Sequence, residues 1–391
     1  MISQVVSAID KVAVDTEKNL LDILDRVHEI RVEAVDQTHL FMLSQAYEGL
    51  LLKMGEKNND GGQFFTPREV IRAMVRVIDP RVGETVYDPG CGTGGFLAQA
   101  FDHMRAGLGD GATAEQLRIL REETFWGREK ADLIYPIALA NLVLHGIDHP
   151  HIWHGNTLTG TAAYDGLYEG APKLYDVILM NPPFGGKEGK DAQTRFAYKT
   201  GATQVLFLQH VIDRLRPAAD DGIGGRCGLV IDEGVLFRTN ETAFVQTKRK
   251  LLDDCDLWCI VSMPPGVFNQ AGAGVKTNLL FFNKGRPTER IWYYDLSDLK
   301  VGKKNPFTLA RMEDFFELVG DSRAGGAADR PDSERSWTVT REEIEARNYD
   351  LKAVNPHRVV EEDTRTPEEL LDEIERQQQT IAEAIAELRR L

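Results

Sequence analysis

The most chemically informative part of the sequence is an apolar run at 177–180 that leads into Asn181-Pro182-Pro183-Phe184. The apolar run predicts a buried strand, and the prolines end it abruptly because proline cannot donate to a sheet ladder and has a fixed φ. Asn181 is therefore expected at a rigid strand end. Its side-chain amide, the Pro182 carbonyl and the Phe184 ring could together hold a flat group that carries an amine.

These four residues could also activate such an amine. An exocyclic aromatic amine is a poor nucleophile because its lone pair is conjugated with the ring. The Asn181 oxygen and the Pro182 carbonyl could accept both amine hydrogens and stabilise charge that develops on nitrogen. Phe184 could stack on a base that has swung out of its helix. A plain strand-ending turn is the structural alternative.

A glycine-rich turn precedes this site by two predicted strands. It reads Asp88-Pro89-Gly90-Cys91-Gly92-Thr93-Gly94-Gly95-Phe96 and joins a predicted strand to a predicted helix. Such a turn lets the backbone approach a ligand closely and points a helix N-terminus at it. The spacing differs from the dinucleotide pattern, and the Asp88 carboxylate would disfavour a pyrophosphate but suit an ammonium group. S-adenosylmethionine fits better than NAD, and a structural turn is the alternative. The candidate cofactor residues here are Asp88, Gly90, Gly92, Thr93, Gly94, Gly95 and Phe96.

Two further strand ends carry polar residues. Glu129 follows Phe125-Trp126-Gly127-Arg128 just before a predicted helix, where an acidic residue binds ribose hydroxyls in this topology. Its distance from the glycines exceeds the usual interval, and an insertion around 107–111 with the helix after it explains the delay. Asn156, Thr157 and Leu158 follow the next strand, and Asn156 could recognise an adenine edge. A Gly-Asn pair of this kind is more often a turn.

The remaining pattern predicts the elements that position these residues. Residues 1–60 have helical periodicity and form a predicted N-terminal helical domain. Thr66-Pro67-Arg68-Glu69 predicts a capping box with Thr66 as the N-cap. From 61 to 317, strands alternate with helices, which predicts an α/β catalytic domain with a Rossmann-like sheet and helices on both faces. The predicted strands span 85–87, 124–126, 151–154, 177–180, 227–231, 258–262, 279–283 and 290–294. The predicted helices span 67–78, 95–104, 130–145, 204–215 and 243–253.

The last part of the chain divides into two segments. Residues 318–336 have no periodicity, and 318–365 is predicted to be an irregular connection. A second capping box begins at Thr366 and opens a C-terminal helix at 366–391. Apolar residues alternate by three and four from Leu371 to Leu388, a stripe too short for a stable isolated coiled coil. It must pack against this chain or against a partner helix.

Composition limits the chemistry further. The 391 residues carry a formal net charge of −15, which opposes unaided binding to a polyanion. Local basic groups occur at Lys187, Lys190, Arg195 and Lys199, and again at 248–250, where a solvated helix face is expected. The four cysteines have no metal-ligand or CxxC spacing, so reduced thiols and no metal site are predicted. Neither an export signal nor a membrane span is predicted, which favours the cytoplasm.

With these motifs in this order, the chain resembles the modification subunit (HsdM) of type I restriction-modification systems. This subunit is an N6-adenine DNA methyltransferase. The resemblance covers nearly the whole chain. It extends to 207–212, 233–237, 264–269, 275–282 and 347–351, which the chemistry does not require. In the family, the segment matching Gln63-Phe64-Phe65-Thr66-Pro67 meets the methionine end of S-adenosylmethionine. Positions 128 and 231–234 depart from the usual pattern, and the N-terminal domain is short for the family.

The resemblance also implies partners. A separate specificity subunit (HsdS) reads the DNA sequence, two modification subunits flank it, and the last helix packs on it. A restriction subunit (HsdR) is a further implied partner. Two other functions stay open at this stage. One is amine methylation of RNA or of a protein glutamine, which the same acceptor geometry could serve. The other is a non-catalytic assembly subunit that retains the fold.

Overall fold

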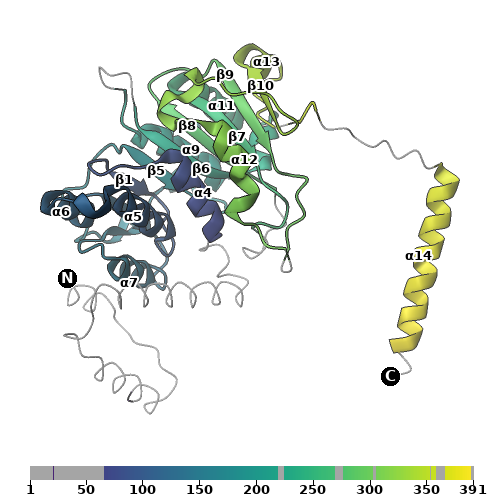
Figure 1. The fold of residues 1–391 in the computed structure, drawn as a ribbon, viewed down its shortest axis with the longest axis horizontal. Coiled ribbons are helices and arrows are strands. Elements are labelled where there is room, and N and C mark those ends of the chain that lie inside the picture. The colour runs from purple at the N-terminus through teal and green to yellow at the C-terminus, as the bar shows by residue number, and fades with distance from the viewer. Residues whose placement is uncertain are drawn as a thin grey trace. The chain divides into compact units, whose positions relative to one another are not determined.

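The computed structural model of the chain describes residues 21, 66–218, 224–268, 276–302, 305–352, 354–357 and 366–388 (Figure 1). The chain divides into two compact units, residues 1–355 and 356–391, and each is described by itself. The predicted helical domain at 1–60 lies outside the described residues except for Leu21. Among the helices that are described, none combines the length and apolarity needed to cross a bilayer.

The first unit is built on a ten-stranded mixed sheet. Its strand order is β10-β9-β7-β8-β6-β5-β1-β2-β3-β4. The strands are β1 (Val86–Asp88), β2 (Phe125–Glu129), β3 (His151–Asn156), β4 (Thr161–Tyr164), β5 (Val177–Met180), β6 (Arg226–Asp232), β7 (Cys255–Ser262), β8 (Thr277–Lys284), β9 (Arg290–Asp295) and β10 (Ser336–Thr340).

The order of the strands reverses at β1, which pairs in parallel with β2 on one side and β5 on the other. Strands β3 and β6 extend this parallel region outward. β8 is antiparallel to both β6 and β7, and β4 and β10 are antiparallel edge strands. In open α/β sheets, ligands bind at the carboxyl ends of strands where the order reverses. The sheet therefore places the ends of β1, β2, β3 and β5 along one edge.

Helices cover both faces of the sheet because successive strand side chains point to opposite sides. Val177 and Leu179 face one hydrophobic cluster, whereas Ile178 and Met180 face another. The first cluster packs against α4 (Arg68–Ile78), α5 (Gly95–Leu108), α6 (Ala114–Glu122), α7 (Tyr135–His145) and α12 (Glu313–Val319). The second packs against α9 (Thr203–Arg214), α10 (Glu233–Phe237), α11 (Thr242–Asp254) and α13 (Arg341–Ala346). The short elements are η3 (Gly109–Gly111), α8 (Lys190–Gln193), η5 (Leu309–Met312) and η6 (Ser322–Ala327).

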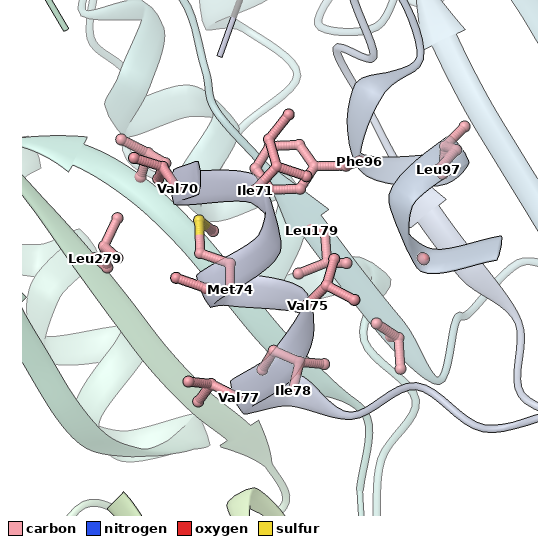
Figure 2. Packing of buried hydrophobic residues seen from close by; sticks show 14 of the residues in the cluster. Val70, Ile71, Met74, Val75, Val77, Ile78, Phe96, Leu97, Leu179 and Leu279 are labelled. Carbon is pink, nitrogen blue, oxygen red and sulfur yellow. The ribbon is translucent and has the colours of Figure 1, made fainter. Parts of the chain in front are cut away.

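Helix α4 is pinned to the sheet by most of its side chains. Figure 2 shows its apolar residues between Leu179 of β5, Leu279 of β8, and Phe96 and Leu97 of α5. Val70, Ala73, Met74 and Ile78 are fully buried. Burial of a Val, Met or Ile side chain stabilises the fold by about 1.5–3 kcal/mol, so the N-terminal end of α4 is held firmly beside β5.

The predicted strands and helices within the catalytic region are confirmed, with ends that shift by a few residues. The helix expected after 107–111 is present as α6, and the structure adds β4, β10, α8, α10, α12 and α13. The helix predicted from Lys130 begins only at Tyr135. The reason is local: the Glu129 carboxylate accepts hydrogen bonds from the N–H groups of Lys130 and Ala131, which holds them in a turn.

The irregular connection predicted at 318–365 is wrong for part of its described length. It contains η6, β10 and α13, and β10 pairs with β9 over the five positions Ser336–Thr340. Arg330 anchors the stretch, since it donates to the carbonyls of Val319 and Gly325 and lies 4.4 Å from the Trp258 ring. The pairing with β9 and the contact with Trp258 are long-range, and local periodicity does not encode them.

The solvated helix face predicted at 248–250 is also wrong for Lys248. This side chain is buried and donates to the carbonyl oxygens of Leu236 and Arg238, which closes the end of α10. Burial lowers the pKa of Lys248 to about 8. Arg249 and Lys250 lie near carboxylates on the same helix. The four cysteines are free and buried, as predicted.

The second unit contains α14 (Pro367–Leu388). Its predicted capping box is confirmed, because Thr366 N–H donates to the Glu369 carboxylate and Glu369 N–H donates to the Thr366 hydroxyl. Leu371, Ile374 and Ile381 of the predicted stripe are 60%, 52% and 59% exposed.

Candidate active site

A cavity of about 540 Å³ opens at the sheet edge where the strand order reverses. Residues from the ends of β1, β2, β3 and β5 line it, together with the first turns of α4 and α5. This volume lies within the range of small-molecule and cofactor sites. The cavity brings together residues that the sequence predicted separately, namely Thr66, Asp88, Gly90, Gly92, Thr93, Gly95, Phe96, Glu129, Asn156, Thr157, Leu158, Asn181 and Pro183.

The glycine-rich turn forms one wall of the cavity. Gly92 and Gly94 have φ values of 54° and 81°, a left-handed conformation that favours glycine, and Gly94 is the N-cap of α5. A Cβ on Gly90 would lie 3.1 Å from the Met180 side chain. The turn is also fixed from below, because Asn141 of α7 donates to the Thr93 carbonyl. These features let the backbone face a ligand directly.

Glu129 lies under the glycine-rich turn at the end of β2. One carboxylate oxygen accepts from Gly92 N–H, and the other accepts from Lys130 and Ala131 N–H. Burial raises its pKa, and the three backbone donors oppose that rise. The carboxylate therefore shapes the turn, in addition to lining the cavity, where it could accept from ribose hydroxyls.

Asp88 is almost fully buried at the end of β1. Burial raises its pKa to about 8, Gly90 N–H opposes the rise by donating to its carboxylate, and the nearby Glu129 carboxylate adds to it. An acid of this kind is favoured in its charged form when a cation binds beside it. The geometry therefore suits a positively charged ligand.

Asn156 mainly stabilises the turn that follows β3. Its side-chain oxygen accepts from the N–H groups of Leu158 and Thr159, as in an Asx turn. The Thr157 hydroxyl donates to the Pro89 carbonyl and so joins this turn to the glycine-rich one. Leu158 is buried below. Recognition of adenine by Asn156 stays a prediction. Because the side-chain oxygen already accepts two hydrogen bonds, the amide nitrogen would make that contact.

Asn181 has the most specific environment in the cavity. Its amide nitrogen donates to the Thr66 hydroxyl at 3.0 Å. Its side-chain oxygen is buried and has no hydrogen-bond partner within the described part of the chain. A buried acceptor without a donor is costly, and it is a ready position for the hydrogen of an incoming amine.

This contact corrects the predicted capping box at the start of α4. The N-cap is Pro67 and receives no side-chain hydrogen bond. Thr66 is instead the partner of Asn181, and Glu69 accepts from Leu309 N–H and Arg72. The prediction failed because the strand end of β5 competes for the Thr66 hydroxyl.

The residues after Asn181 are held as expected for a rigid strand end. Pro182 is buried and Pro183 lines the cavity. The Phe184 ring packs edge to face on Phe268, with ring centroids 5.8 Å apart. Its catalytic role stays a prediction, as do those of its neighbours. Gln63, Phe64 and Phe65 lie outside the described residues.

Sequence reasoning missed several residues that line the cavity. Arg68, Gln99, Asn141 and Lys187 all contribute to its wall. Arg68 follows Thr66-Pro67 directly and was visible as a cation at a helix start, but Gln99 and Asn141 come from helices whose sequence shows only ordinary periodicity. Among the described residues, no group of three or more metal-ligating side chains is brought together.

Comparison with known proteins identifies the family. The family model described as N-6 DNA Methylase matches residues 38–365. The methylase subunit of the type I restriction enzyme EcoEI from Escherichia coli is 36% identical over 379 residues, which is 95% of this chain and 72% of that protein. The EcoKI methylase subunit from E. coli K12 is 33% identical over 317 residues, 76% of this chain and 56% of that protein.

Solved structures agree. A chain from a structure on complex assembly and conformational transition of a type I R-M system superposes with a TM-score of 0.79 and 38% identity, covering 99% of this chain and 77% of that one. The sheet has the fold of S-adenosylmethionine-dependent methyltransferases. Within that class, the chain belongs to the N-6 DNA methylase family, as its resemblance to type I modification subunits predicted. It spans 72% and just over half of the two curated relatives.

The contact between Thr66 and Asn181 gives a test of the site. Thr66→Val removes the hydroxyl that orients the amide, and a hydrogen bond of this kind is worth about 0.5–1.5 kcal/mol. We expect methyl transfer in single turnover to slow by roughly 2- to 13-fold. Thr66→Ser keeps the hydroxyl and should restore the rate. Equal rates in Thr66→Val and the unsubstituted protein would show that the contact does not position Asn181.

Proposed function

We propose that this chain transfers a methyl group from S-adenosylmethionine to N6 of an adenine in DNA, as the modification subunit of a type I restriction-modification system. The observation that carries the proposal is the buried Asn181 oxygen, which has no hydrogen-bond partner among the described residues and lies in a cavity shared with the glycine-rich turn. Family membership supports the choice of DNA adenine as the substrate.

The target amine would lie between two acceptors. The Asn181 oxygen accepts one hydrogen of the amine, and the Pro182 carbonyl accepts the other. Thr66 keeps the amide in the orientation that presents oxygen rather than nitrogen. Accepting both hydrogens favours a pyramidal nitrogen with a localised lone pair, and Phe184 stacks on the base once it has left the helix. No strong base is required, because the surplus proton can leave to water after transfer.

The cavity fits S-adenosylmethionine by charge as well as by size. The cofactor, when bound, supplies a methyl group activated on a sulfonium. Asp88 and Glu129 are the acidic groups beside the glycine-rich turn, and both pKa values are raised by burial, which a bound cation would oppose. Arg68 lines the same cavity near Thr66 and offers a counter-charge for a carboxylate. The adenosine part would lie toward Glu129 and Asn156, and the methionine part toward Thr66.

Partners follow from charge and from α14. A chain with a net charge of −15 needs help to bind DNA, and a specificity subunit would supply sequence recognition. The exposed stripe of Leu371, Ile374 and Ile381 on α14 suits packing against helices of that subunit. Two modification subunits per specificity subunit, with a restriction subunit in the complete nuclease, is the assembly we propose. The proposed location of this assembly is the cytoplasm.

The rival functions are less well supported. Methylation of RNA or of a protein glutamine could use the same two acceptors, but the family match covers residues 38–365. A non-catalytic assembly subunit would have no use for an Asn181 oxygen that lacks a partner in the described structure, or for a left-handed glycine turn beside it.

The first prediction concerns the catalytic amide. Asn181→Ala should slow transfer of labelled methyl to DNA by about 10²–10³-fold or more, because it removes an acceptor used in the transition state. The measurement is a single-turnover assay with the specificity subunit present. Cofactor affinity is measured in parallel to show that the cavity is intact. Unchanged transfer by Asn181→Ala would contradict the proposed mechanism.

The second prediction concerns Asp88. With a pKa of about 8, its carboxyl is protonated below that pH in the cofactor-free protein, and a bound cation selects the ionised form. The ratio of the S-adenosylmethionine affinity of the unsubstituted protein to that of Asp88→Asn should therefore rise between about pH 6 and 8, by up to about tenfold per pH unit, and then level off. The ratio cancels titration of the ligand itself. Calorimetry measures both affinities, and a ratio independent of pH would refute the role.

The third prediction concerns α14. Removal of residues 366–391 should abolish co-purification with the specificity subunit, because the exposed apolar stripe is lost. Cofactor binding should persist, since the cavity is built entirely within the first unit. The substitution of Ile374 and Ile381 by Glu is a milder version of the same test. Assembly that survives both changes would show that the stripe is not the partner surface.

A further inference from the structure

The segment at 185–202, between Phe184 and α9, is not used by the catalytic chemistry. It carries Lys187, Lys190, Arg195 and Lys199 but only two acidic residues, Glu188 and Asp191. Its formal charge is therefore +2, in a chain whose total is −15. The segment directly after the catalytic residues is thus locally cationic in an acidic chain.

The segment is a closed and well-held loop. Its two ends pair at an isolated bridge between Lys187 and Ala202, and Glu188 N–H donates to the Gly201 carbonyl. Gln209 of α9 is buried, accepts from Tyr198 N–H and donates to the Tyr198 carbonyl, as a neighbouring strand would. Ala192 is buried in the core below. The backbone of the loop is thus fixed before any partner binds.

Arg195 ties this loop to the cofactor side of the cavity. Its guanidinium donates to the Thr159 carbonyl at 2.6 Å and lies against Gly160, where a Cβ would come within 2.8 Å of it. Thr159 ends the turn that begins at Asn156. Arg195 is therefore a structural strut and is not available for a separate partner.

The three lysines of this loop differ from the Lys and Arg side chains that are held in ion pairs elsewhere in the described structure. Lys187, Lys190 and Lys199 are exposed, and within the described residues none of them forms an ion pair. Lys187 also lines the mouth of the cavity, next to Gly186 and Glu188. Ammonium groups on a fixed loop, without carboxylate partners, are suited to a polyanion.

We propose that Lys187, Lys190 and Lys199 form a preorganised phosphate-binding edge, which holds the DNA backbone beside the adenine that enters the cavity. The inference rests on the proposed function and names the part of the chain that contacts the DNA backbone. Lysine is a point charge rather than a planar fork, so these contacts bind phosphate without reading sequence. They supply local affinity for DNA, which the negative net charge of the chain otherwise opposes.

The test is the salt dependence of DNA binding by the complex with the specificity subunit. The double variant Lys190→Gln and Lys199→Gln should reduce the slope of log K against log[salt] by about 2, because each phosphate contact contributes about 0.9. The loss should be the same for a duplex with the recognition sequence and for an unrelated duplex. Both lysines lie outside the cavity lining, so cofactor affinity should not change.

Lys173→Gln is the matched control. Lys173 is also exposed and without an ion pair in the described structure, but it precedes β5 and so lies at the opposite sheet edge from Asn181. Its substitution should leave the slope unchanged. A double variant with an unchanged slope overturns the proposal. A double variant that no longer co-purifies with the specificity subunit also overturns it, since the loop would then be a protein interface. Methyl transfer by the unsubstituted complex tests the proposed function separately.

Discussion

The hydrogen bond from the Asn181 amide to the Thr66 hydroxyl links residues 115 positions apart, and the site depends on it. It decides which end of the amide faces the cavity. With nitrogen held by Thr66, the oxygen is left as an acceptor in a buried position. Thr66 can hold it only because α4 is fixed against β5 by an almost entirely buried face (Figure 2). The packing of α4 therefore determines the orientation of the Asn181 amide through this one hydrogen bond.

The strand order supplies the other constraint. β1 lies between β2 and β5, so the glycine-rich turn, Glu129 and Asn181 end at one edge although they are far apart in sequence. Glu129 accepts from Gly92 N–H, and Thr157 donates to the Pro89 carbonyl. The loops thus fix one another through side-chain to backbone bonds. Hydrogen bonds of this kind let a glycine turn keep its shape despite its conformational freedom.

Much of this could be predicted from sequence, because the signals were local. Val177–Met180 is an uninterrupted apolar run closed by prolines, and its bounds are confirmed. The glycine spacing and the position of Glu129 at a strand end are similarly local. Thr66 was misassigned because its sequence is a good capping box, while its true partner is distant. The predictions for Lys248 and for the stretch around Arg330 were wrong for the same reason, because their partners lie in other elements.

The central proposal is that the Asn181 oxygen receives the N6 amine of adenine. Its most direct test is the identity of the methylated product. Labelled S-adenosylmethionine is incubated with DNA and the complex with the specificity subunit, and the DNA is then digested to nucleosides. The account predicts label in N6-methyldeoxyadenosine. Label in a methylated cytosine, in RNA or in protein would contradict it.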